Sequence, residues 1–537
     1  MLIFIAIALY LRTIGFGITT FDDDFFVVRN FDFHQHLTNI AEAFTKPFLG
    51  VYYRPVITTS FILDAQFSQT SAWMYHCSNI TFHAIASCLV FILLTKFRFD
   101  RWSSFLATLL FVLHPLATEA VAWIPGRNDS IETIFVLGSL IAFLSFREEG
   151  KLQYFFLHLV LFFLALCSKE SALLLPIVTV GTLNLKFRTE NSVRPTFVLL
   201  GWMVIILVWW LLRTSAIETN RTSETVFALA AFVSNLRVLP EVFGKMIFPF
   251  SLSAYARFNN FATVSGIIVL ISGIVFLSKV NIKQNAFVWL GIGWVILFIL
   301  PSLSVSIVDR AYRFDYLESR FYLPLVGLSI FAAEILGRYE FRFKKFFAIL
   351  SIFIFFSLGF LTSNYISVFE NPLTMWEHAA VTSPGAAETH HNLALAYIAS
   401  GKPSDQVVNA YRRAINLNPA ESKYHNELGV FYGRSRSIKL ADEEFRSAIK
   451  ADPVNPDAYF NLGILSYLRD DLAGAEQLWL KASALDSSYP DPQLKLVDLY
   501  IRERNFLSAA VYVRRLQQLG IAVRPEILDI LRNKMSQ

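Results

Sequence analysis

The sequence predicts an all-α protein in two parts: a helical membrane domain that crosses the bilayer many times, then a helical-repeat solenoid. Two observations predict this fold class. Apolar residues make up 55% of the 537 residues, charged residues only 17%, and the mean hydropathy is +0.48. These values are too apolar for a soluble protein of this size. From about residue 371 the charge rises, and a short phrase begins to repeat every 34 residues.

Apolar runs recur up to about residue 365, and a spanning helix needs roughly 20 such residues. We predict eleven spans. The first is expected to be retained, because it lacks the basic start and the small-residue cleavage site of a signal peptide. The predicted spans are 2–19, 77–95, 103–118, 130–146, 152–168, 171–185, 196–212, 262–278, 285–301, 321–337 and 347–364.

Short basic connections predict the orientation, because Lys and Arg collect in cytoplasmic loops. In the eleven-span arrangement all five fall on one side, which places the N-terminus in the cytoplasm and the C-terminal region outside. We expect a plasma or inner membrane. The five connections are KFRFDR (96–101), REEGK (147–151), KFRTENSVR (186–194), SKVNIK (278–283) and RYEFRFKK (338–345).

The C-terminal repeat is marked by Ala414, Ala448 and Ala482, each 34 residues from the next. The period, with small residues inside each first helix, resembles the tetratricopeptide pattern, and about four units are expected. Such arrays present a concave groove to a peptide or protein. We therefore predict a membrane domain over 1–370 and an extracytoplasmic repeat domain over 371–537.

An acidic triplet, Asp22, Asp23 and Asp24, begins the first outer segment. Carboxylates beside a bilayer are costly and commonly mark function. One could act as a general base on a hydroxyl, or hold a divalent cation beside a phosphate. The alternative is an interfacial cap that only orients the first helix, although acidic residues contribute little to orientation. No other metal site is predicted, and the net charge of +5 without a long basic run gives no reason to expect nucleic acid.

Further ionisable residues gather on the same predicted side. Each alone is more simply an anchor at the membrane boundary, and Arg54 could be a snorkelling side chain. Together, however, four outer Lys and Arg residues run against the usual orientation rule and suit a lipid phosphate. The candidate donor-binding residues are Arg54, Glu119, Arg127, Lys169, Glu170, Glu318, Arg320 and Tyr322.

Helix 73–90 places His76, Asn79 and His83 on one face, at i, i+3 and i+7. A metal site would need more ligands than the sequence offers there. We predict that these side chains make hydrogen bonds between helices.

The ordered motifs resemble a known family. FDDDFFVVRN, YYRPVITTSF, HPLATEAVAWIPGRND, SKESALLLP, FPFSLSA, ESRFYLPLVGL and NPLTMWEHA, followed by the repeats, occur in the order found in the transmembrane and tetratricopeptide-repeat O-mannosyltransferases and their prokaryotic relatives. These are similar to glycosyltransferases of the GT-C fold. The paired Asp of that family corresponds to Asp22 and Asp23, with Asp24 as an extra acid, and Arg54 matches its Tyr-Arg-Pro motif. The ESRFYLP stretch is one residue shorter than the usual spacing.

The resemblance implies a polyprenyl-phosphate sugar donor, with mannose as the candidate sugar, used on the extracytoplasmic side. The acceptor would be a Ser or Thr of a protein. Two other functions stay open: a membrane-anchored scaffold without catalysis, and a transporter of lipid-linked sugars. Charges near the bilayer midplane would favour transport, whereas the predicted charges lie mainly on one face.

Overall fold

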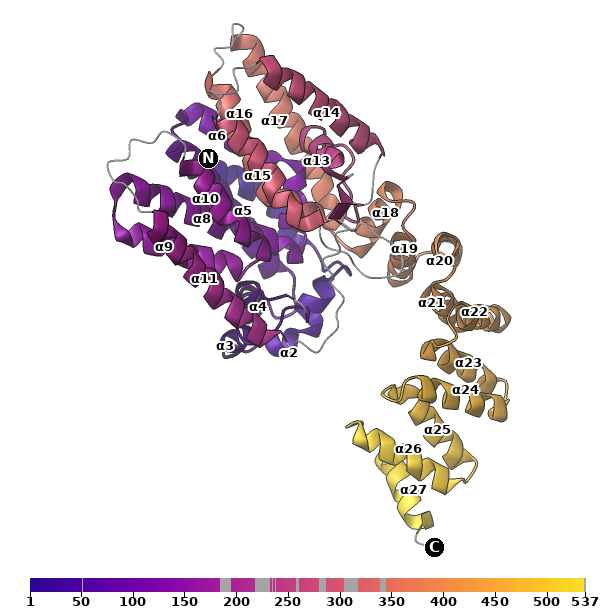
Figure 1. The fold of residues 1–537 in the computed structure, drawn as a ribbon. Helices are drawn as coiled ribbons and strands as arrows, with labels where there is room; N and C mark the ends of the chain where they lie inside the picture. The colour runs from indigo at the N-terminus through magenta and orange to yellow at the C-terminus, as the bar shows by residue number, and fades with distance from the viewer. Residues whose placement is uncertain are drawn as a thin grey trace. The chain divides into compact units, whose positions relative to one another are not determined.

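The computed structural model describes residues 1–50, 52–183, 195–217, 232–233, 235–236, 238–256, 260–279, 286–303, 317–338 and 344–535 (Figure 1). The chain forms two compact units, Met1–Ser383 and Pro384–Gln537, called here the membrane unit and the repeat unit. The boundary that the sequence predicts, at residue 370, lies one short helix before the boundary between the two units. That helix, α18 (Pro372–Thr382), packs with the membrane unit through the buried side chain of Trp376.

The described residues contain helices and no β-strand, apart from an isolated bridge between Phe48 and Tyr52. The α-helices of the membrane unit, besides α18, are α1 (Leu2–Tyr10), α2 (Phe31–His34), α3 (Asn39–Ala43), α4 (Pro55–Ser68), α5 (Trp73–Lys96), α6 (Arg101–Leu113), α7 (Thr118–Ala122), α8 (Arg127–Glu149), α9 (Leu152–Leu166), α10 (Leu175–Leu183), α11 (Pro195–Ala216), α13 (Val238–Ile247), α14 (Asn260–Lys279), α15 (Ala286–Leu303), α16 (Tyr322–Arg338) and α17 (Lys344–Ile366). Short 3-10 or π turns join them: η1 (Leu11–Gly15), η2 (Asp24–Arg29), η3 (Pro115–Ala117), η4 (Ile124–Gly126), η5 (Glu170–Leu174), η7 (Glu318–Phe321) and η8 (Ser367–Phe369).

Over the described residues, each predicted span overlaps a helix or neighbouring helices; residues 184, 185 and 285 of two predicted spans lie outside them. By length and composition, six helical segments are long and apolar enough to cross a membrane, and seven if α6 and the bent segment after it form one span. The others are shorter apolar helices such as α9. The helical membrane fold is confirmed, and the count of eleven spans stays a prediction. The six segments are Trp73–Lys96, Ile124–Glu149, Pro195–Ala216, Ala286–Leu303, Glu318–Gly337 and Ile349–Phe369.

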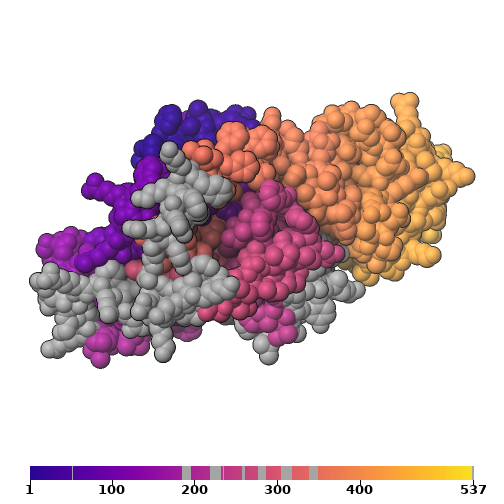
Figure 2. Space-filling view, turned by 90° about the horizontal axis from the view of Figure 1, so that it is seen from above, coloured from indigo at the N-terminus to yellow at the C-terminus, as the bar shows by residue number. Residues whose placement is uncertain are grey.

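Helices of the membrane unit approach closely where small residues meet. A Cβ added to Gly266 of α14 would collide with the carbonyl of Pro240 in α13, so only glycine permits this approach. The chain ends of the unit also meet. The indigo N-terminal residues lie beside α17, where Arg12 donates a hydrogen bond to the carbonyl of Ser363 (Figure 2).

The repeat unit consists of helical hairpins, in agreement with the tetratricopeptide prediction. Four hairpins are followed by a single helix, and the left-handed residues Gly401, Arg436, Asp470 and Arg504 end the first helix of each hairpin. The helices are α19 (Ala387–Ala399), α20 (Ser404–Leu417), α21 (Ser422–Arg434), α22 (Ile438–Ala451), α23 (Pro456–Leu468), α24 (Leu472–Leu485), α25 (Pro490–Arg502), α26 (Phe506–Gln518) and α27 (Pro525–Met535).

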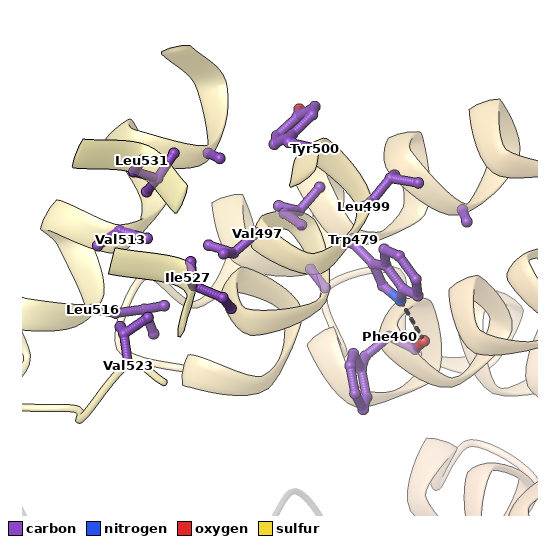
Figure 3. Close-up of a cluster of buried hydrophobic side chains, with 14 residues drawn as sticks. Phe460, Trp479, Val497, Leu499, Tyr500, Val513, Leu516, Val523, Ile527 and Leu531 are labelled. Atoms are coloured by element: carbon purple, nitrogen blue, oxygen red, sulfur yellow. Dashed lines mark hydrogen bonds between the residues drawn. The ribbon is translucent and has the colours of Figure 1, made fainter. Parts of the chain in front are cut away.

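In the hairpins, a large side chain of the second helix packs against a small residue of the first helix. Trp479 of α24 packs over Gly463 of α23, where an added Cβ would stand 2.5 Å from the indole nitrogen. The same nitrogen donates to the carbonyl of Phe460 at 3.2 Å (Figure 3). Ala414, Ala448 and Ala482, which revealed the period, are all fully buried. The repeat therefore reflects one packing arrangement used again in each hairpin.

Candidate active site

The acidic loop, residues 16–23, connects η1 to η2. Hydrogen bonds inside the loop close its last turn: the backbone N–H and the hydroxyl of Thr19 donate to Oδ2 of Asp23 at 2.8 and 2.7 Å. Asp22, which lies between Thr19 and Asp23, adopts a left-handed conformation with φ of 64°. This local geometry turns neighbouring carboxylates of the triplet in different directions.

The three aspartates occupy three different environments. The side chain of Asp24 pairs with Arg29 at 2.7 Å on an exposed surface, and Asp22 is also exposed. Asp23 is only 1% exposed, and its Oδ1 has no hydrogen-bond partner among the described residues. Burial raises the pKa of Asp23 to about 8, although the hydrogen bonds from Thr19 act in the opposite direction. Asp23 is therefore the member of the triplet whose environment suits a general base.

Phe21 of the acidic loop packs into an aromatic cage, defined as Phe21, Trp123, Tyr255 and Trp376. The Phe21 ring stacks on Trp123 at 5.4 Å between ring centroids and meets Trp376 and Tyr255 edge-on at 5.7 and 6.0 Å. The indole nitrogen of Trp123 donates to the Phe21 carbonyl at 2.9 Å. The cage joins three of the sequence motifs, which lie far apart along the chain, with Tyr255, the residue that follows FPFSLSA.

A first ionic cluster forms where α4, α8 and η5 meet. Arg54, which precedes α4, pairs with Glu170 at 2.8 Å, and Lys169 pairs with Asp129 of α8. Ser171 donates to Glu132, a buried carboxylate that the sequence analysis did not select, at 2.6 Å. The guanidinium of Arg54 also lies 4.3 Å from the centre of the Tyr52 ring. The fold thus brings Arg54, Lys169 and Glu170 together in one cluster.

Arg127 lies in a separate, fully buried ion pair. Its Nη1 donates to Asp64 at 2.6 Å and its Nη2 to the Tyr75 carbonyl at 2.9 Å, while the Phe61 ring covers the guanidinium at 4.5 Å. Ser78 donates to the other oxygen of Asp64 at 2.6 Å. These contacts neutralise Arg127 within the fold, so it holds α4, α5 and α8 together.

A second ionic cluster surrounds Glu318, which is fully buried. Its Oε1 accepts from Lys245 at 2.9 Å and from the backbone N–H of Ser253 at 3.1 Å. Lys245 also pairs with Glu241 at 3.0 Å. Beside this cluster, Oε2 of Glu119 accepts from the backbone N–H of Ser319 at 2.8 Å. Glu119 and Glu318 therefore bind η7 and the segment before α14 into the core of the unit.

Arg320 and Tyr322, at the start of α16, differ in their surroundings. Tyr322 is fully buried, and its hydroxyl lies 2.7 Å from Nδ1 of His83. Arg320 is half-buried, and its Nη1 has no hydrogen-bond partner in the described part of the chain. Arg320 is thus a predicted cation with a buried guanidinium nitrogen whose hydrogen bonding is incomplete among the described residues.

An apolar cavity of about 340 Å³ lies between α13, α14, α15 and α16. Phe243 and Met246 of α13 face it on one side, and Gly327 and Phe331 of α16 on another. Gly327 follows Arg320 by seven residues, about 10 Å along a helix axis. The cavity therefore begins within a few helical turns of Arg320, on the same segment of chain.

The hydrogen bonds predicted between helices are confirmed for two of the three side chains of α5. His76 is the exception, because neither of its ring nitrogens has a hydrogen-bond partner among the described residues. Asn79 donates to the carbonyls of Val121, Trp123 and Ile124 at 3.0 to 3.3 Å, and His83 bonds to Tyr322. Asn79 thereby fixes the connection that carries Trp123. Among the described residues, no three His, Cys, Asp or Glu side chains are grouped so as to hold a metal ion.

Several polar residues of these clusters escaped the sequence analysis, notably Asp64, Glu132, Glu241 and Lys245. Each lies inside an apolar helix, and a charge in such a helix was the available signal. Trp376 gave no comparable signal in the sequence, because its indole nitrogen forms its hydrogen bond with Thr20, 356 residues away.

Comparison with known proteins gives related sequences, and no family model matches the chain. It is 28% identical over 451 residues to protein O-mannosyl-transferase F38B6.6 of Caenorhabditis elegans, which covers 78% of this chain and 62% of that protein. It is 35% identical over 140 residues to human protein O-mannosyl-transferase TMTC3, covering 24% and 15% respectively. The chain thus spans less than two thirds of the length of these relatives.

Solved structures give only weak similarity. A structure of pilF from Pseudomonas aeruginosa is 22% identical, with a TM-score of 0.27, over 33% of this chain and 78% of that one. Yeast Tom70 is 12% identical, with a TM-score of 0.28, over 76% of this chain and 93% of that one. At these scores neither supports a conclusion. The sequence matches confirm the resemblance of the ordered motifs: homologues of this chain include curated proteins named protein O-mannosyl-transferase, among them TMTC3 and TMTC2.

Proposed function

We propose that this protein is a membrane glycosyltransferase of the GT-C type, with Asp23 as its general base. It would transfer a sugar from a polyprenyl-phosphate donor to a Ser or Thr hydroxyl of a protein, on the extracytoplasmic side. The names of the relatives point to mannose and to a protein acceptor. The observation that carries the proposal is Asp23 itself, which is buried, accepts hydrogen bonds from Thr19, and has one unpaired oxygen among the described residues.

The donor needs an apolar site and a cationic one, and the segment from η7 to α16 supplies a residue of each kind: Arg320 as the cation, and Gly327 and Phe331 in the lining of the cavity. The cavity beside Gly327 and Phe331 is lined by apolar side chains, which suits a prenyl chain. Arg320, before the same helix, is the cation that we assign to the phosphate. Arg54 and Lys169 already pair with carboxylates, so they would act on the phosphate by exchanging those partners.

Transfer would proceed by one displacement at the anomeric carbon. The hydroxyl oxygen of the acceptor forms the new bond to that carbon while its proton passes to Asp23. The bond from carbon to the phosphate oxygen breaks, and its electron pair leaves with the polyprenyl phosphate, whose added negative charge meets Arg320. A single displacement inverts the anomeric centre. General-base assistance of this kind contributes roughly 100- to 10,000-fold to the rate.

The repeat unit is assigned to the acceptor. Its hairpins form the type of array whose concave face binds peptides and proteins. The transfer site and the repeat unit would both face away from the cytoplasm, as the five basic connections predict.

Two measurements test the proposal. Mass spectrometry of the protein purified in mild detergent should detect a bound polyprenyl-phosphate sugar. A transfer assay with that donor and a Ser/Thr-containing protein should then lose 100-fold or more of its rate in Asp23→Asn. The matched control is Asp32→Asn, which removes the same charge from an exposed position of α2. If Asp23→Asn transfers sugar at the wild-type rate, the base assignment is wrong. If no donor binds and no transfer occurs, the non-enzymatic scaffold becomes the better account.

A further inference from the structure

The acidic loop is fastened to the last segment of the membrane unit. The indole nitrogen of Trp376, on α18, donates to the hydroxyl of Thr20 at 3.1 Å, and the Trp376 ring packs against Phe21. Nearby, the backbone N–H of Gly17 donates to the carbonyl of Glu370 at 3.1 Å. Trp376 is only 1% exposed. The loop is thus tied to this segment at three successive points on its way to Asp23.

The helix that carries Trp376 is itself held at both ends. Asn371 and Thr374 form a reciprocal capping box at its start. At its end, Thr382 and Ser253 share a hydrogen bond of 2.6 Å, and Ser383 donates to the carbonyl of Tyr255 at 2.6 Å. Since Tyr255 belongs to the aromatic cage, α18 and the cage brace each other. Trp376 therefore offers the loop a fixed point of attachment.

A fixed point matters to the loop because Asp22 lies in the left-handed region. That conformation costs a residue with a side chain on the order of 1 kcal/mol, although Asp tolerates it better than most residues. Asp22 lies between Phe21, which the cage holds, and Asp23, which Thr19 holds. Freeing Phe21 would allow Asp22 to relax, and Asp23 would then turn away from its present direction.

We propose that Trp376 is a positioning residue for Asp23: it holds the acidic loop so that the unpaired carboxylate oxygen keeps one direction. Trp376 contacts Thr20 and Phe21, and it acts on Asp23 through them. The inference rests on the proposed function, because it assigns Trp376 a role in that reaction. A displacement of about 1 Å in a catalytic group can cost 100-fold in rate, which sets the expected scale.

The test compares Trp376→Phe and Thr20→Val with the wild type in the sugar-transfer assay. Trp376→Phe keeps an aromatic ring but loses the donor, and Thr20→Val loses the acceptor with little change of shape. Each should lower kcat by 10- to 100-fold and leave the KM for the donor within about twofold. The double variant should be no slower than the slower single variant, because both changes remove one hydrogen bond.

The pH dependence of kcat supplies a readout that a purely structural role would not move. Asp23 must be ionised to act, so kcat should rise with pH to a midpoint near its pKa of about 8. The charged groups that act most strongly on Asp23 are Asp22, on its own loop, and Arg127, on α8. Loosening the loop exposes the carboxyl to water, which lowers its pKa, so the midpoint should fall in both variants.

The matched control is Trp479→Phe. Trp479 is also 1% exposed, and its indole nitrogen also donates a hydrogen bond, but it lies in the repeat unit. This variant should keep the wild-type pH midpoint. If Trp376→Phe keeps the wild-type kcat and midpoint while Asp23→Asn is inactive, the positioning role is wrong and the proposed function stands. If Asp23→Asn is itself active, the base assignment fails, and the role of Trp376 fails with it.

Discussion

The two units of this protein hold their polar side chains together over very different distances along the chain. In the membrane unit, Trp376 bonds to Thr20 across 356 residues, and Glu119 to Ser319 across 200. In the repeat unit, His391 bonds to Glu427 across 36 residues. The candidate site therefore depends on the assembly of the whole membrane unit. Each part of the repeat unit depends mainly on its neighbours.

The units also differ in what they bury. Arg127 with Asp64, and Lys245 with Glu241 and Glu318, are ion pairs at nearly zero exposure in the membrane unit. The centre of the repeat unit is apolar, with Trp479, Leu496 and Leu499 buried among similar side chains. We therefore expect the removal of one charge to lower the stability of the membrane unit most. Removal of apolar volume should lower the stability of the repeat unit most.

A large effect on stability is expected from Arg127→Met. It leaves Asp64 buried without its cation, which typically costs about 3–5 kcal/mol. Thermal unfolding of the purified protein in detergent should show the membrane unit melting at a lower temperature. The double variant Arg127→Met with Asp64→Leu should recover much of the loss, since neither charge remains. An unchanged melting temperature in the single variant would contradict this account of the pair.

Trp479→Ala should act on the repeat unit with a cost of about 3–5 kcal/mol, because it opens a cavity over Gly463. Circular dichroism should record earlier unfolding of the repeat helices. The melting of the membrane unit should stay within experimental error of the wild type. If both units unfold at a lower temperature, the contrast between a repeat unit stabilised by local contacts and a membrane unit stabilised by distant contacts is wrong.

The pH dependence of stability should differ between the wild type and Asp23→Asn. Burial raises the pKa of Asp23 from 3.8 to about 8 in the folded state, so folding favours the protonated acid. Its contribution to stability is complete below about pH 4 and is lost as the pH rises toward 8. Between pH 6 and 8 the change amounts to at most about 3 kcal/mol. Melting temperatures across this range should fall more steeply in the wild type. Parallel curves would show that Asp23 does not titrate in this way.

The smallest effect is expected from Arg469→Gln in the repeat unit. Arg469 is exposed and pairs at 2.9 Å with Asp442, which Arg446 also holds. Exposed pairs of this kind contribute less than about 1 kcal/mol, so the melting temperature should barely move. A loss as large as that of Trp479→Ala would mean that the surface of the repeat unit stabilises it more than its apolar centre.

Sequence reasoning predicted the helical elements well, because their signals are local. Over the described residues, each predicted apolar run overlaps a helix or neighbouring helices, and the 34-residue period of Ala414, Ala448 and Ala482 marks positions that the fold buries. The prediction for Asn79 and His83 also held, since a polar side chain in an apolar helix must find a partner. The candidate site was predicted less completely. The triplet was found, but its members could not be ranked.

By itself, the sequence determined that this chain forms apolar helices followed by helical hairpins, because periodicity and composition act over a few residues at a time. It also determined which motifs carry the ionisable groups. Only the tertiary structure decided that Asp23 is buried while Asp22 and Asp24 face outward, and that Arg127 is neutralised by Asp64. The physical reason is that burial and pairing depend on segments far away in the chain, such as the one that carries Trp376, and no local pattern encodes where those segments come to lie.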